Sequence, residues 1–176
     1  IVIIAESDNS YKGYATAIAG AIIAKGVASA IQTVTDDVRV RISPSTIIAQ
    51  QGNIVIHASV KDITSNLTAY GGAGGVVTNA NAIVEFIGGS SGNHASVNAR
   101  TGDTTIGTET NTEARVYGKI KFTVDGLSSI STDVKNTMKI NSKIDLGSYT
   151  EVSAAKNLDI QALIKRIYAY ASAYSK

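Results

Sequence analysis

The sequence predicts an all-β protein built as a solenoid of stacked strands, and three observations support this. β-Branched residues dominate the apolar set, with 23 Ile and 15 Val against 5 Leu, and such side chains suit a pleated surface. Several stretches alternate apolar and polar residues with period two, as half-buried strands do. A similar motif also recurs at intervals of roughly fifty residues, which is typical of repeat architectures.

The composition excludes several classes of function. The chain has 176 residues, of which 44% are hydrophobic, enough for a core and too many for a disordered protein. A formal net charge of +2 is too weak to predict a nucleic-acid partner. The absence of Cys excludes disulfides, thiol nucleophiles and cysteine-based zinc or iron–sulfur sites.

The repeat is clearest in a motif that reads β-branched residue, polar residue, Ala, polar turn and alternating strand. Its copies lie at 47–58, 97–106 and 152–162, with the alanine at 49, 99 and 154. The first residues, 1–5, match 54–58 and look like the tail of a further copy. We therefore expect a single domain over 1–176, excised from a longer repetitive protein, with units near 1–52, 53–102, 103–156 and 157–176, the last one partial.

The segments between these motifs also correspond. Residues 16–20 match 68–72, and 28–34 match 80–86, both at an offset of 52. Because the unit is long, we expect it to span two or three coils of about 20–25 residues, giving about seven to nine rungs and a rod of about 35–45 Å. A β-sandwich is the main competing fold, although it does not require a repeat.

The alternation predicts which side chains face the core. Ile54, Ile56 and Ala58 are expected inside, with His57 and other residues of opposite parity outside. The same pattern places 38, 40 and 42 inside and Arg39 and Arg41 outside. Small residues are expected to face a narrow core at 15, 17, 19 and 21, at 69, 71, 73 and 75, and at 169, 171 and 173. Turns are expected at 43–44, 51–53, 88–93, 102–103 and 125–126.

The alanine-rich stretch near 14–31 has a second interpretation, because Ala is the best helix former. A short helical insertion there is the alternative to strands. Residues 15–31 are also nearly long enough for a membrane helix, but they contain Lys25 and Gly26, and the matching later segment contains GGAGG. We therefore expect no transmembrane segment in this chain.

Three segments carry a resemblance to a known family: GNIVIHA at 52–58, SNLTAYGGAGGVVTNANAIVEFIGG at 65–89 and HASVNARTGD at 94–103. They resemble the repeats of leukotoxin-type filamentous adhesins of bacteria, and more distantly those of filamentous haemagglutinin. The resemblance implies a right-handed parallel β-helix that is secreted or held at the bacterial cell surface. It also implies an outer-membrane secretion partner for the full-length protein, and contact with host cells. It implies no catalytic residue.

Few residues of the sequence point to catalysis, metal binding or cofactor binding. His57 and His94 lack the spacing of a zinc site, and Gly71–Gly75 lacks the ending of a phosphate loop. Stacking could bring Asp36 near Glu85, but no acidic position repeats as a polysaccharide-cleaving site would need. We therefore predict no catalytic residue, no metal and no cofactor.

Outward tyrosines are the most suggestive surface feature, since Tyr offers amphipathic contact area at low entropic cost. The candidate partner-contact residues are Tyr70, Tyr168, Tyr170 and Tyr174, and the alternative is that they pack beneath a neighbouring coil. The predicted function is a non-enzymatic rod segment of an adhesin or leukotoxin that contacts a host-cell protein or glycan. The alternatives are a β-helical polysaccharide-acting enzyme and an inert spacer.

Overall fold

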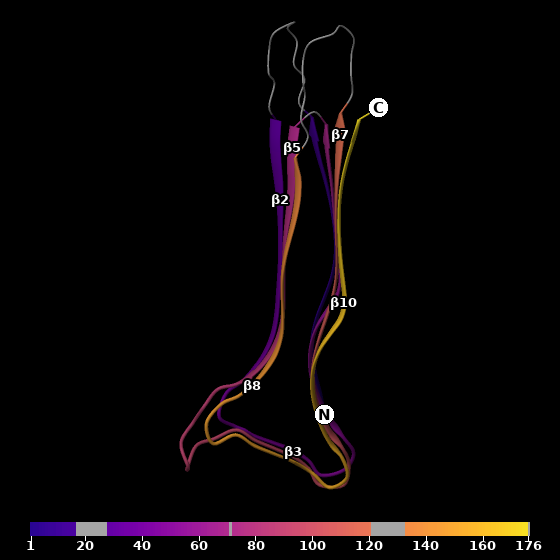
Figure 1. The fold of residues 1–176 in the computed structure, drawn as a ribbon. Coiled ribbons are helices and arrows are strands. Elements are labelled where there is room, and N and C mark those ends of the chain that lie inside the picture. Colours follow the sequence, from indigo (N-terminus) through magenta and orange to yellow (C-terminus); the bar gives the residue numbers. More distant parts are fainter. Residues whose placement is uncertain (17–27, 71, 121–132, 176) are drawn as a thin grey trace, which may run out of the picture.

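The computed structural model describes residues 1–16, 28–70, 72–120 and 133–175, and in these residues every regular element is a β-strand (Figure 1). The strands are β1 (Val2–Thr16), β2 (Ala28–Ile42), β3 (Thr46–Ala49), β4 (Ile54–Tyr70), β5 (Gly72–Phe86), β6 (Ser96–Ala99), β7 (Thr104–Ile120), β8 (Val134–Leu146), β9 (Glu151–Ala154) and β10 (Leu158–Ser175).

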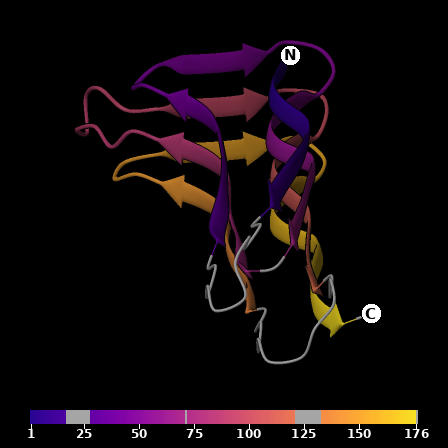
Figure 2. The ribbon, with the colours of Figure 1, turned by 90° about the horizontal axis from the view of Figure 1, so that it is seen from above.

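The strands form three sheets, and neighbours within each sheet are parallel. Sheet A has the order β1-β4-β7-β10, sheet B has β2-β5-β8, and sheet C has β3-β6-β9. We call three consecutive strands, one in each sheet, a circuit. Sheets A and B are long and run side by side, and the short sheet C closes one end between them (Figures 1 and 2). The expectation of an all-β chain is confirmed, and the parallel pairing differs from the antiparallel sheets of the competing sandwich.

The register confirms the motif at the ends of the circuits. Ala49 pairs with Ala99, and Ala99 pairs with Ala154. The first residues also align as expected, with Ala5 opposite Ala58. One isoleucine row runs through all of sheet A, consisting of Ile3, Ile56, Ile106 and Ile160.

The expected coil length is wrong. One unit of the repeat supplies one strand to each sheet, so it makes a single circuit rather than two or three. The reason is strand length: β1 has 15 residues and β10 has 18, whereas the expectation assumed short strands. In the residues that the structure describes, sheet A accordingly has four strands and sheets B and C have three each, rather than seven to nine rungs.

The offset of 52 between the intermediate segments is also wrong. Thr16 pairs with Tyr70 and not with Thr68, and Ala28 pairs with Gly72 and not with Ala80. Residues 17–27 join β1 to β2, whereas Gly71 alone joins β4 to β5, so the offset falls from 54 to 44. Both offsets are even, as is the predicted one, so the match of residues 28–34 with 80–86 still joins positions on the same face of sheet B.

The core lies between sheets A and B, and Ala49, Val97 and Ala99 of sheet C belong to it. Ile54, Ile56 and Ala58 are fully buried, and the alternation at 38–42 is confirmed. The small residues depart from expectation in two strands. In β5 the buried parity is that of Gly74 and Val76, so Ala73 and Gly75 lie on the outer face. In β10, residues 169, 171 and 173 have core-facing parity yet remain exposed, because no described strand covers that edge.

Side-chain and backbone hydrogen bonds tie the corners after sheet C together. The Asp103 amide donates to Asn53 Oδ1 at 3.0 Å, and the Asn157 amide donates to Asp103 Oδ1 at 3.0 Å. Gly52 has φ of 83°, which favours glycine. A Cβ on Gly102 would overlap the Gly52 carbonyl and the Asn53 side chain, so this corner requires glycine. The turns expected at 51–53 and 102–103 are confirmed.

The helical alternative near 14–31 is wrong where the structure describes it. Residues 14–16 end β1 and 28–31 begin β2, while 17–27 lie outside the described residues. The turn expected at 125–126 and the inward positions 17, 19, 21 and 71 lie there as well. Among the described residues, the structure contains no helix long and apolar enough to cross a membrane.

Candidate functional site: the outward face of sheet A

The part of sheet A from Thr64 of β4 towards the ends of its strands presents rows of side chains away from the core. The residues facing inward beside it, Thr112, Ala114 and Val116, are fully buried, so the intervening positions point outward. The parallel register aligns these outward positions across three strands. We call the grid the tyrosine platform; it consists of Thr64, Asn66 and Thr68 on β4, Glu113, Arg115 and Tyr117 on β7, and Tyr168, Tyr170 and Ser172 on β10.

A nearly buried carboxylate organises the platform. The Glu113 side chain is only 11% exposed, and it accepts hydrogen bonds from Arg115 on its own strand and from Arg166 on β10. Hydrogen bonding with Tyr117 and with Glu113 raises the pKa of Arg115. Two guanidinium groups share one carboxylate, so the cluster keeps one positive charge and is held in place by charge-assisted bonds.

The aromatic rings pack on this charged cluster. The Arg115 guanidinium carbon lies 5.2 Å from the centroid of the Tyr168 ring, and that of Arg166 lies 5.9 Å from it. The rings of Tyr117 and Tyr170 are tilted by 49° with centroids 5.5 Å apart. Cation–π and aromatic contacts of this kind fix ring orientation. Tyr168 and Tyr170 nevertheless keep 38% and 39% of their surface exposed, which leaves amphipathic area for a partner.

The structure brings two of the four predicted contact residues, Tyr168 and Tyr170, into the platform. Tyr70 and Tyr174 both pair with Lys119 and so share the next row along the strands, but their side chains lie outside the described part of the structure. In the described residues no coil packs over Tyr168 and Tyr170, which are exposed.

Four members of the site were not predicted from the sequence: Glu113, Arg115, Tyr117 and Arg166. A signal was available for the residues of β7. The alanine anchors at 99 and 154 are 55 residues apart, and the same offset places Tyr168 opposite Glu113 and Tyr170 opposite Arg115, as observed. The same offset places Arg166 opposite Asn111, as observed, but its contact with Glu113 is a diagonal one, two residues further along β7, which the offset does not give.

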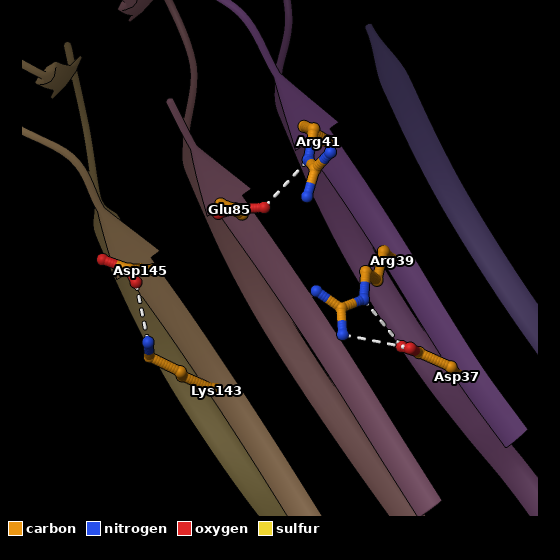
Figure 3. A network of polar contacts seen from close by, with 6 residues as sticks. All are labelled: Asp37, Arg39, Arg41, Glu85, Lys143 and Asp145. Carbon is orange, nitrogen blue, oxygen red and sulfur yellow. Dashed lines mark hydrogen bonds and ion pairs between the residues drawn. The ribbon is translucent and has the colours of Figure 1, made fainter. Parts of the chain in front are cut away.

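The outward face of sheet B is different, being a lattice of exposed ion pairs (Figure 3). Arg39 donates two hydrogen bonds to Asp37 at 2.8 and 3.0 Å, and Arg41 reaches across to Glu85 on β5 at 2.9 Å. On β8 a further pair joins Lys143 to Asp145 at 2.7 Å. The predicted projection of Arg39 and Arg41 from one face is confirmed, and both are paired with acids as a solvated surface would be.

Other predicted candidates do not assemble. Asp36 and Glu85 lie on opposite faces of sheet B, because Asp36 faces the core and Glu85 pairs with outward Arg41. Asp36 accepts hydrogen bonds from Ser7 and Asn9 instead. Such paired carboxylates, needed for a polysaccharide-cleaving site, are therefore not formed by these two residues.

The histidines lie apart in the fold. His57 faces outward on β4, and its ring occupies the space beside Gly107, where a Cβ would lie 2.6 Å from the ring. His94 lies in the loop before β6. Within 1–16, 28–70, 72–120 and 133–175, no three His, Cys, Asp or Glu side chains group as metal ligands would.

Comparison with known proteins gives no assignment: no protein-family model, no curated protein and no solved structure matches this chain.

Proposed function

We propose that the chain is a rod segment of a secreted or surface-held bacterial adhesin or leukotoxin of the filamentous type, built as a right-handed parallel β-helix. One observation carries the proposal: residues one repeat apart pair in parallel register in all three sheets. Such pairing aligns the outward side chains of successive circuits in rows. The family and the secretion route are proposed from the resemblance of 52–58, 65–89 and 94–103 to filamentous adhesin repeats.

The tyrosine platform is the surface that we assign to contact with the host cell. It combines exposed rings on Tyr168 and Tyr170 with the ordered guanidinium groups of Arg115 and Arg166. Rigid aromatic residues give contact area at low entropic cost, and Arg adds hydrogen-bond donors for a protein or glycan partner. A stiff rod with several such surfaces would gain affinity through multivalency.

Binding to cultured host cells tests the proposal. The biotinylated chain is displayed in several copies on streptavidin beads, and attachment is measured against bead concentration. We expect saturable attachment, reduced at least about tenfold by the double change Tyr168→Ser and Tyr170→Ser, because a few aromatic residues carry most of the energy of a contact surface.

Tyr149→Ser is the matched control, since Tyr149 is 62% exposed in the turn between β8 and β9, away from the platform. Far-UV circular dichroism establishes that each variant keeps its strand content. Absence of saturable attachment by the unchanged chain would overturn the adhesin role. Attachment that survives the double change would identify the platform as inert and the segment as a spacer.

A further inference from the structure

The outer edge of β10 carries an apolar face that is exposed in the described structure, whereas the same face is buried in β4 and β7. Ile160, Ile164 and Ile167 have core-facing parity in the register with β7, yet they are 39%, 47% and 56% exposed. The residues opposite them on β7 are fully buried. Edge strands with unpaired main-chain groups and apolar side chains are templates for a further strand.

Sheet A has an alternation that specifies what kind of strand fits this edge. Lys61 in β4 and Lys165 in β10 have no partner in the register, so each is an extra residue that forms a bulge. Neither β1 nor β7 carries such a residue at this position. Across sheet A, bulge-free strands (β1 and β7) therefore alternate with bulged strands (β4 and β10).

Charge follows the same alternation. The Lys61 ammonium group donates to Glu6 of β1 at 2.6 Å, and that of Lys165 donates to Glu109 of β7 at 2.8 Å. Glu6 and Glu109 occupy equivalent positions, because both pair with Ser59 of β4. Each bulge lysine thus contacts an acid on the preceding bulge-free strand.

Lys61 also has an acidic residue near it on the strand that follows, β7. Hydrogen bonding and charge from Glu6 raise the pKa of Lys61, with smaller contributions from Asp8 and from Glu109 on the following strand. The register agrees, since Glu6 of the preceding bulge-free strand and Glu109 of the following one both lie opposite Ser59, two residues before Lys61. In the part of the chain that the structure describes, Lys165 has such a strand on the β7 side.

We propose that the β10 edge binds a parallel, bulge-free strand of the same repeat type, which places an acidic residue at Lys165 and a β-branched residue beside Ile160. The isoleucine row of sheet A, present in all four strands, requires the β-branched residue. The positions of Glu6 and Glu109 require the acid. This inference concerns assembly of the sheet and is independent of the host-contact proposal.

A labelled synthetic peptide tests the edge directly. The peptide VIIAESDNSYKGY, residues 2–14, is the chain's own bulge-free strand and contains Ile3 and Glu6. Fluorescence anisotropy measures its binding to the full chain, and hydrogen exchange locates it. We expect saturable binding that protects amides of β10. A peptide of residues 55–68, which carries the bulge Lys61, is expected to bind at least about tenfold more weakly because its register is displaced.

Charge reversal distinguishes specific strand pairing from nonspecific binding of the peptide. Lys165→Glu in the chain is expected to weaken binding of the bulge-free peptide by about three- to tenfold. The Glu6→Lys peptide should recover affinity for that variant. Lys12→Glu is the control, since it makes the same charge change on β1, the far edge of sheet A. Equal binding of the bulged peptide, protection of β1 instead of β10, or indifference to Lys165→Glu in a variant with unchanged circular dichroism would overturn the proposal.

Discussion

The outward faces of sheets A and B are built on the same parallel register but hold their charges in different ways. On sheet B the acids that pair with Arg39, Arg41 and Lys143 have side chains 31–47% exposed, so water solvates both partners. On sheet A, Glu113 is 11% exposed and takes two arginines. The first arrangement keeps a surface soluble, whereas the second fixes side chains in defined positions.

The difference arises from the neighbours of each acid. Glu113 has Thr64 on one side and Tyr168 on the other in the register of sheet A, and its side chain is 11% exposed. Glu85 has Arg41 and Asp145 beside it, and neither covers it. The more buried acid therefore has two guanidinium groups and an aromatic neighbour around it, and this ordered cluster is the reason that our proposal places recognition on sheet A.

The largest expected difference between the two faces concerns stability. Glu113→Gln leaves two guanidinium groups without their carboxylate, and we expect a loss of about 1–2 kcal/mol in the free energy of unfolding, reduced from a fully buried value because both arginines are half exposed. Glu85→Gln on sheet B should cost less than about 0.5 kcal/mol. Urea denaturation followed by circular dichroism measures both, and equal losses would contradict the distinction.

A smaller effect should appear in the coupling between side chains. A double-mutant cycle on Tyr117 and Tyr170, using Ala, is expected to give about 0.5–1.5 kcal/mol. The cycle on Arg41 and Glu85 should give about 0.2–1 kcal/mol in dilute buffer and nearly nothing in about 1 M salt, where the screening length is about 3 Å. A tyrosine coupling that disappears in salt would show that the platform is held by charge alone.

The sequence predicted the class of fold because its evidence was local. Alternation at 38–42 and 54–58 requires only that strands have period two, and it holds whatever the register. The predicted correspondence of residues 49, 99 and 154 is also confirmed, because glycine and Asx residues fix the corners that follow them. Coil length could not be obtained this way, because nothing in an alternating stretch shows whether it turns or runs straight for 15 residues.

The candidate site was less predictable, because it depends on lateral neighbours. Tyr168 and Tyr170 could be recognised as outward residues, but their value comes from Arg115 and Glu113 one strand away. Such lateral neighbours can be predicted only if the register of each strand pair is known. The extra residues Lys61 and Lys165 change that register inside single strands. Uniform offsets along the sequence therefore place some contacts correctly and miss others.

Two glycines on the outer faces allow a matched comparison of local space. A Cβ on Gly75 of sheet B would lie 3.7 Å from the Lys135 carbonyl and 3.8 Å from Ile31, which are ordinary contacts. Gly75→Ala should therefore stabilise the fold by about 0.4–1 kcal/mol by restricting the unfolded chain. On sheet A the same change at Gly107 must displace His57, so we expect no gain. Thermal denaturation measures the stability of both variants. A more stable Gly107→Ala variant would show that the His57 ring moves freely.

The smallest expected effect is on stability at alkaline pH, and it should differ between Tyr11 on the inner face of sheet A and Tyr168 on the platform. Burial, and then the charge and hydrogen bonding of Asp36, raise the pKa of Tyr11 above 10.0. Below pH 10 the phenol is protonated in both folded and unfolded chains, so its contribution to stability is fully present; it is lost as the pH rises through the raised value in the folded state. Tyr11→Phe should remove that part of the alkaline loss, while Tyr168→Phe on the platform should leave it unchanged. Difference absorbance of tyrosinate, compared among the three proteins, measures the shift, and titration of Tyr11 at its ordinary value would show that Asp36 does not act on it.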